Sequence, residues 1–62
     1  MNDFALCRRV ADGWLILDKG APRDMRADCD ATRQRQYRRA DADYKVLRTG
    51  RPIGAIVPAR NP

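Results

Sequence analysis

Histidine, glutamate and serine are all missing from this 62-residue chain. Without histidine the commonest general base is absent, and Cys7 and Cys29 are too few to bind zinc by themselves. Without serine, and with no histidine to activate either cysteine, nucleophilic catalysis has no suitable residue. The four glycines are dispersed and form no phosphate-binding loop. We therefore expect a protein that binds and does not catalyse, with no catalytic residue, metal or cofactor.

Long apolar segments are missing as well. The longest apolar run, Trp14 to Leu17, is far shorter than the roughly 18 residues of a membrane span. The first ten residues are interrupted by charges and do not resemble a secretory signal. We expect a cytoplasmic protein with no membrane partner. Its two cysteines are expected to be free, partly buried thiols, a single disulfide being the alternative.

Charge, by contrast, is abundant and unbalanced. The chain has 13 Lys and Arg residues against 8 acidic residues, all of them Asp, and a formal net charge of +5. A GC-rich coding sequence explains why Arg exceeds Lys, but it does not explain the net charge. A positive field of this size on a small protein attracts polyanions or acidic protein surfaces.

Turn signals divide the chain into five elements. Asp12-Gly13 is a strong signal for a two-residue hairpin turn, and it lies between apolar-rich segments 4–11 and 14–19. Gly20-Ala21-Pro22 ends the second segment. A second hairpin is expected from Tyr44–Arg48 and Pro52–Val57 around a turn at residues 49–51.

The segment between the hairpins has the composition of a helix. Residues 23–43 contain no Gly, Pro, Val or Ile. Asp24, Asp28 and Asp30 are alternative N-caps, and Ala31–Ala40 is expected to be helical whichever is used. The order predicts a small α+β domain of the form ββαββ, with one helix packed on an antiparallel sheet of two hairpins. It spans residues 1–62, with 59–62 as a flexible tail.

Strand alternation assigns the faces of the sheet. A type I′ turn at Asp12-Gly13 pairs Val10 with Leu15. The predicted core face then holds Phe4, Leu6, Val10, Leu15 and Leu17, joined from the second hairpin by Tyr44, Val46, Ile53, Ala55 and Val57. The outer face holds Ala5, Cys7, Arg9, Ala11, Trp14 and Ile16. A one-residue slip or bulge at the turn is the alternative, and it moves Trp14 into the core and Leu15 and Leu17 outward.

Two sets of residues are candidates for binding. The first comprises arginines on one helical side and around the last turn, without interleaved acids: Arg35, Arg38, Arg39, Arg48 and Arg51. The second is an outer apolar set that predicts an oligomer or protein interface: Trp14, Ile16 and Cys7. A thin core in so short a chain also favours a homodimer or higher oligomer.

These features favour a non-catalytic module that contacts nucleic acid, or a nucleoprotein complex, through an Arg-rich helix. Scattered aromatics and a single helix exclude a stacking platform and a helix-turn-helix, so phosphate contacts with weak sequence preference are expected. The alternative is a protein-targeting inhibitor or adaptor of the kind that phages and mobile elements encode, such as the anti-CRISPR proteins. It rests on analogy of size, since no motif carries it.

Overall fold

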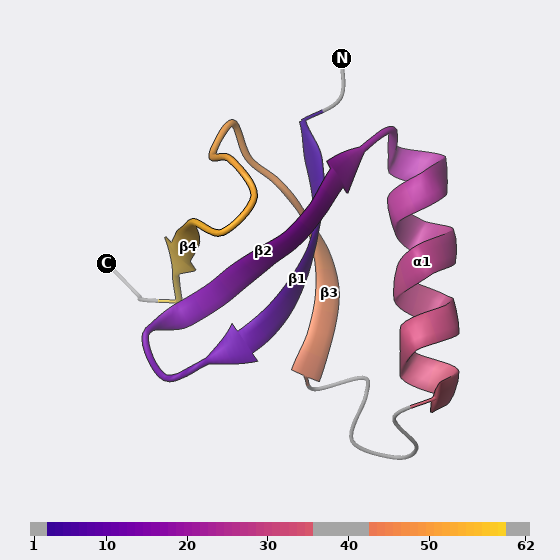
Figure 1. The fold of residues 1–62 in the computed structure, drawn as a ribbon, viewed down its shortest axis with the longest axis horizontal. Helices are drawn as coiled ribbons and strands as arrows, with labels where there is room; N and C mark the ends of the chain where they lie inside the picture. The colour runs from indigo at the N-terminus through magenta and orange to yellow at the C-terminus, as the bar shows by residue number, and fades with distance from the viewer. Residues whose placement is uncertain (1–2, 36–42, 60–62) are drawn as a thin grey trace.

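A computed structural model describes residues 3–35 and 43–59 of the chain. It contains four strands and one helix, in the predicted ββαββ order (Figure 1). The elements are β1 (Phe4–Val10), β2 (Gly13–Gly20), α1 (Pro22–Arg35), β3 (Tyr44–Arg48) and β4 (Ile56–Pro58). The strands form one antiparallel sheet, so the predicted fold class is confirmed.

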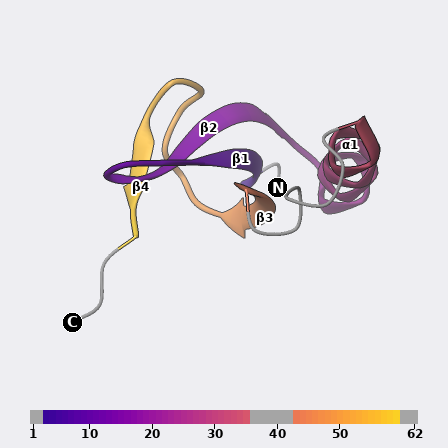
Figure 2. The ribbon, with the colours of Figure 1, turned by 90° about the horizontal axis from the view of Figure 1, so that it is seen from below.

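The order of strands in the sheet is β3-β1-β2-β4. The first hairpin therefore forms the centre of the sheet, and β3 and β4 lie at its two edges. The expected second hairpin is wrong, because β3 pairs with β1 while β4 pairs with β2. Residues 49–55 connect one edge to the other. Figure 2 shows the resulting twist, with β4 running across the direction of the central hairpin.

The central turn lies one residue earlier than expected. Val10 pairs with Gly13, so Ala11 and Asp12 form the turn and the predicted pairing of Val10 with Leu15 is wrong. Gly13 is therefore required for the packing of β4 on β2 and not for the turn. A side chain at Gly13 would collide with the carbonyl oxygen of Val57, and the φ of Gly13 is +152°. Glycine at this position therefore allows β4 to approach β2.

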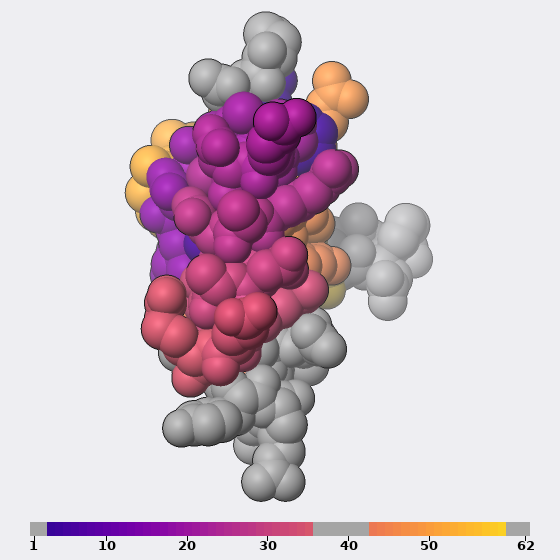
Figure 3. Space-filling view, turned by 90° about the vertical axis from the view of Figure 1, so that its right-hand side faces the viewer, coloured from indigo at the N-terminus to yellow at the C-terminus, as the bar shows by residue number. Residues whose placement is uncertain are grey.

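The helix begins at Pro22, earlier than any of the three aspartates proposed as N-caps. Proline suits the first helical position, where its fixed φ is helical and its missing N–H would have no partner. Met25 N–H donates to the carbonyl oxygen of Ala21 (3.0 Å), which closes the first turn. Residues 36–40 of the predicted helix lie outside the described residues. Figure 3 looks directly onto the outer surface of α1.

A β-bulge interrupts the central hairpin. Cys7 pairs with Ile16, but its neighbour Leu6 pairs with Asp18, so Leu17 is an extra residue in β2. Side chains alternate between the faces of a strand, and one inserted residue reverses the alternation beyond it. Asp18 and Lys19 consequently point to the faces opposite to those that uninterrupted pairing would give them.

Both faces of the sheet are covered, by different segments. On the face that we call the helix face, Met25 and Cys29 of α1 pack on Leu6, with Phe4, Tyr44 and Val46 around them. On the other, which we call the loop face, residues 49–55 and β4 cover a second cluster. Its buried members are Ala5, Cys7, Trp14 and Ile16, and Leu47, Ala55 and Val57 pack against them.

The predicted core face is confirmed in part: Phe4, Leu6, Tyr44 and Val46 pack under α1, but Leu17 is 39% exposed and Ile53 is 60% exposed. The predicted outer face is wrong, because four of its six residues are buried: Ala5, Cys7, Trp14 and Ile16. Trp14 lies in the core, as the alternative interpretation held. A one-residue slip at the turn is not the cause. The observed β1–β2 register next to the turn differs from the predicted one by two positions, and a shift of two leaves Trp14 and Ile16 on their predicted face. They are buried because residues 49–57 cover that face.

Candidate functional site

The residues predicted to form an exposed interface are buried within the chain itself. Trp14 is 6% exposed, and Ile16 and Cys7 are buried more deeply still. Cys7 and Ile16 are direct cross-strand neighbours in the loop-face cluster. The prediction of an interface made by these three side chains is wrong, because they are the core that β4 and the preceding loop cover.

The charged side chains that the strands direct onto the loop face all carry the same sign. The strands direct three of them onto the loop face, as the register shows: Arg9 opposite Trp14, Lys45 opposite Cys7, and Lys19 opposite Ala5. All three are cations. Asp18, the one carboxylate within the four strands, pairs with Leu6 and lies on the helix face. The loop face is therefore a basic surface.

Lys19 has a structural task on this face. Its ammonium Nζ donates to the carbonyl oxygens of Thr49 (2.5 Å) and Arg51 (2.8 Å). These bonds hold the start of the covering loop, while Ile16 N–H donates to the carbonyl oxygen of Ala55 at its end (3.0 Å). Hydrogen bonds from a charged donor are stronger than neutral ones. Lys19 thus fixes the cover of the loop-face core.

Arg9 and Lys45 are placed differently, around the indole of Trp14. The Lys45 Nζ lies 4.4 Å from the ring centroid and the Arg9 Cζ lies 4.8 Å from it. Both distances fall within the range of cation–π attraction. One aromatic ring therefore positions two cations from two different strands.

Arg9, Trp14 and Lys45 line a hollow of about 420 Å³, which we call the cationic hollow. Its remaining lining is an apolar wall from β3, β4 and the residue after β4: Leu47, Val57, Pro58 and Ala59. The described lining includes no carboxylate. Because Trp14 is almost fully covered, its ring is not open for a base to stack on it. What the hollow presents to a ligand is positive charge beside an apolar wall.

A second hollow, of about 340 Å³, lies between α1 and the edge strand β3. Arg26, Asp30 and Arg33 of the helix line it, together with Lys45 and Val46. Arg33 donates from Nη2 to the carbonyl oxygen of Tyr44 (2.8 Å) and lies 4.0 Å from the Asp30 carboxylate. Lys45 belongs to both hollows, so cationic side chains continue from the loop face around β3 to the helix.

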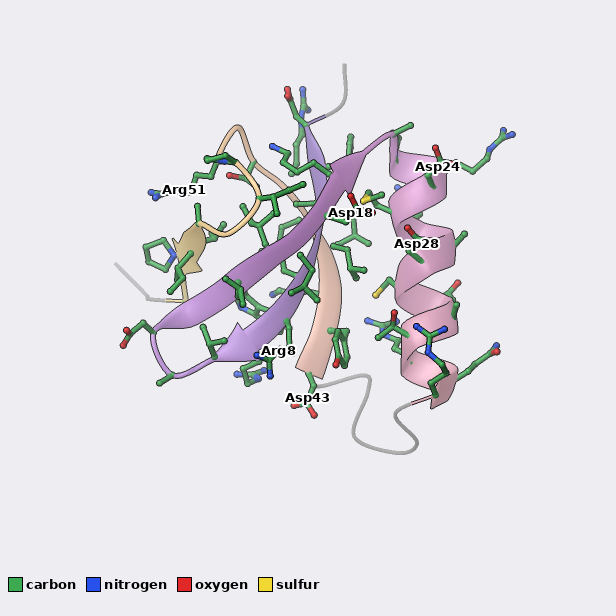
Figure 4. All side chains as sticks on the ribbon, in the orientation of Figure 1. Arg8, Asp18, Asp24, Asp28, Asp43 and Arg51 are labelled. Atoms are coloured by element: carbon green, nitrogen blue, oxygen red, sulfur yellow. The ribbon has the colours of Figure 1, made fainter. Side chains whose placement is uncertain are left out.

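Two aspartates of α1 lie away from this second hollow. Asp24 and Asp28 project on the side of α1 next to β2, where Figure 4 also shows Asp18. Asp24 is in the first turn of α1, where a negative charge favours the helix dipole. Asp24 and Asp28 therefore line neither hollow, whereas Asp30 lines the second one.

The arginines predicted from the sequence are not gathered in either hollow. Arg35 is the exposed last residue of α1, and Arg38 and Arg39 lie outside the described residues. Arg48 and Arg51 are exposed, and Figure 4 shows Arg51 on the side of the molecule away from α1.

Sequence reasoning places Arg9 on the same face as Trp14 but proposes neither Arg9 nor Lys45 as a site residue. The predicted face could have identified Arg9 as a site residue, because it places this cation beside the single tryptophan. Lys45 cannot be added to it without knowing that β3 pairs with β1.

Neither cysteine is placed to act as a nucleophile or to form a disulfide with the other. The two thiols are buried and form no disulfide with each other. Burial raises the pKa of the Cys7 thiol above its ordinary value of 9.0, although the positive charge of Lys45 opposes the shift. A buried thiol that keeps its proton is a poor nucleophile. Within residues 3–35 and 43–59, no three His, Cys, Asp or Glu side chains cluster as metal ligands would.

The described part of the chain contains no helix with the length and hydropathy needed to cross a membrane. Comparison of the sequence with protein-family models and with curated proteins, and of the structure with solved structures, finds no significant match.

Proposed function

We propose that this protein is a non-catalytic binding module for the phosphate backbone of nucleic acid, alone or within a nucleoprotein complex. The observation that carries the proposal is the uniformly cationic loop face of the sheet. Every charged side chain that the strands direct to the loop face is a cation, and Arg9 and Lys45 meet there over one indole. The net charge of +5 adds a long-range attraction for a polyanion.

Trp14 has a supporting role in this proposal. Ordering a long, flexible cationic side chain on binding costs about 0.5–1.5 kcal/mol. Contact with the ring restrains Arg9 and Lys45 before any ligand arrives, which lowers that cost. Because the ring itself is covered, base stacking contributes little. Contacts to phosphate carry no sequence information directly, so we expect similar affinity for unrelated sequences.

Arg35, Arg38 and Arg39 of the helix site predicted from the sequence are candidates for further phosphate contacts. Their contribution is separable from that of the loop face by mutation. We also place the protein in the cytoplasm, a proposal supported by two cysteines that are buried as thiols.

Trp14 is the only tryptophan, and it lies between the two proposed phosphate ligands, so its fluorescence reports directly on the site. Duplex DNA, single-stranded DNA and RNA would each be titrated into the protein at about 50 and 200 mM salt. We expect binding to change the Trp14 emission and to weaken steeply with salt. Each phosphate contact to duplex DNA contributes about 0.9 to the slope of log K against log salt.

Variants then locate the contacts. Lys45→Gln and Arg9→Gln should each reduce the salt slope by about one unit. Arg23→Gln is the matched control, since it removes one exposed cation from the first turn of α1 and should change the slope much less. Absence of any binding at low salt and about 100 μM protein would overturn the proposal. Equal slopes for all three variants would overturn its assignment to the loop face.

A further inference from the structure

The helix face of the sheet is only partly covered by α1. The helix packs over β1 and β3, through Leu6, Tyr44 and Val46, and touches β2 less. Figure 1 shows α1 at one side of the sheet, with β4 at the other. The part of the helix face over β2 and β4 is therefore left without a cover from the described residues.

That uncovered part is apolar. We call it the apolar strip; it consists of Val10, Leu15, Leu17 and Ile56. Leu15 pairs with Ile56 in one cross-strand row, so their side chains are neighbours. Leu17 is 39% exposed and Ile56 is 38% exposed, while Val10 and Leu15 are half-buried. Contiguous exposed apolar side chains on a sheet face are typical of an interaction surface.

Opposite charges flank the apolar strip. Arg8 pairs with Leu15, and Asp18 follows Leu17 on the far side of the bulge. Figure 4 shows Arg8 near the lower end of the central hairpin and Asp18 beside the upper part of β2. Arg8 is thus level with Leu15, with Val10 beyond it toward the turn, and Asp18 lies past Leu17 toward the other end of β2.

We propose that a second copy of this chain covers the apolar strip. A two-fold axis near Leu17, midway between Arg8 and Asp18, would bring Leu17 of the two copies together. The same rotation would place Arg8 of each copy against the partner's Asp18, on both sides of the axis. A surface that carries opposite charges at equivalent positions on either side of an apolar centre is self-complementary, as a two-fold interface requires.

The proposed dimer leaves the loop faces free. The apolar strip lies on the helix face, so the cationic hollows of the two copies would point outward from the interface. The total accessible surface is 4544 Å², and a stable interface takes about 800 Å² from each partner. A strip of four apolar side chains flanked by two charged ones is a small interface, so we expect a weak dimer.

Analytical ultracentrifugation over a concentration series tests this proposal without any ligand. The wild-type protein should shift from 7.1 kDa toward twice that mass as its concentration rises to about 1 mM. Leu17→Asp should raise the Kd at least roughly tenfold, because it places a charge in the apolar centre. Ile53→Asp is the matched control: Ile53 is 60% exposed but lies in the loop on the other face, so this variant should dimerise normally.

Exchanging the end charges identifies the occupant as a second copy. Arg8→Asp alone would oppose two carboxylates at each end, and Asp18→Arg alone would oppose two arginines. Both variants should be monomeric by themselves, with circular dichroism confirming that they are folded. An equal mixture of the two should form a heterodimer, since each contact again joins an arginine to an aspartate. A wild-type monomer at about 1 mM, or a mixture that stays monomeric, would overturn the proposal, and neither result bears on nucleic-acid binding.

Discussion

Ile16 and Asp18 stand two positions apart in β2, yet their side chains lie on opposite faces of the sheet, because Leu17 is inserted between them as a bulge. Uninterrupted pairing would place Asp18 opposite Ala5 on the loop face and turn Lys19 toward the helix. The bulge therefore removes the one carboxylate that the strands could offer the loop face and supplies a cation in its place. A single inserted residue therefore keeps the loop face free of strand carboxylates.

Loss of the Lys19 ammonium should loosen the loop that covers the loop-face core. Hydrogen bonds from a charged donor are worth about 1.5–3 kcal/mol, and Lys19 makes two. We expect Lys19→Met to lower the free energy of unfolding in urea by about 2 kcal/mol. Arg51→Met is the control, because its carbonyl oxygen remains as the acceptor while its exposed side chain changes. Equal stability of the two variants would show that Lys19 does not hold the loop.

Gly13→Ala should prevent β4 from docking as it does now. The new methyl group would meet the carbonyl oxygen of Val57, and backbone cannot move aside as a flexible side chain can. We expect destabilisation of about 1–3 kcal/mol, with faster hydrogen exchange at Ile16 and Gly54, whose amides pair across this edge. Gly50→Ala provides the comparison, since no atom lies within 4 Å of the point where its new methyl group would stand. If Gly13→Ala proves as stable as Gly50→Ala, the close approach of β4 is wrong.

Arg33 should be the residue that ties the end of α1 to the sheet. Its guanidinium bonds the carbonyl oxygen of Tyr44 at the start of β3. Replacement by Met keeps the apolar stem but removes this bond, which should lower the free energy of unfolding by about 1.5–3 kcal/mol. Arg35→Met, two residues later on the exposed side, should change it by less than about 0.5 kcal/mol. Thermal and urea unfolding of the two variants would measure the difference.

The buried thiol of Cys7 should make stability depend on pH in alkaline solution. Its pKa in the folded protein is raised by burial above the value of 9.0 expected when unfolded. The folded state therefore holds the proton more tightly, so this stabilisation is present below pH 9.0 and is lost as the pH rises through the raised pKa.

Other groups titrate in the same range, so the comparison is between wild type and Cys7→Ala. The variant has a cavity that lowers its stability at every pH, but its stability should fall less steeply above about pH 9. Urea unfolding between about pH 7 and pH 10 would give both slopes. Parallel slopes would contradict a buried, protonated Cys7.

The sequence is sufficient to predict the fold class and the first hairpin, because turn residues and composition act locally. Asp12-Gly13 marks the right turn to within one residue, and the absence of breakers marks the helix. Local signals are insufficient to predict which strands pair. In the sequence, Tyr44–Arg48 and Pro52–Val57 look like the two strands of a hairpin. In the sheet, β1 and β2 lie between the strands β3 and β4 that these segments form, because each edge of the central hairpin accepts one of them.

The loop face is wrongly assigned as an outer surface from the sequence for a related reason. Both sides of the central hairpin are apolar, since one packs under α1 and the other under residues 49–57. Alternation shows that Trp14 and Ile16 share a face, but it does not show what covers that face. To predict the Arg9–Trp14–Lys45 arrangement one must know the β1–β3 register and which segment covers the loop face. Neither can be read from local sequence.

The position of β3 and β4 at opposite edges also orders the events of folding. Phe4 pairs with Arg48 and Gly13 with Pro58, which are 44 and 45 positions apart. A hairpin forms in about 1–10 μs, whereas sheets dominated by such distant pairs take milliseconds to seconds to fold. β3 pairs only with β1 and β4 only with β2, and both of these pairings close far longer loops than the β1–β2 turn does. The central hairpin should therefore act as the nucleus, and the two edges should add to it independently.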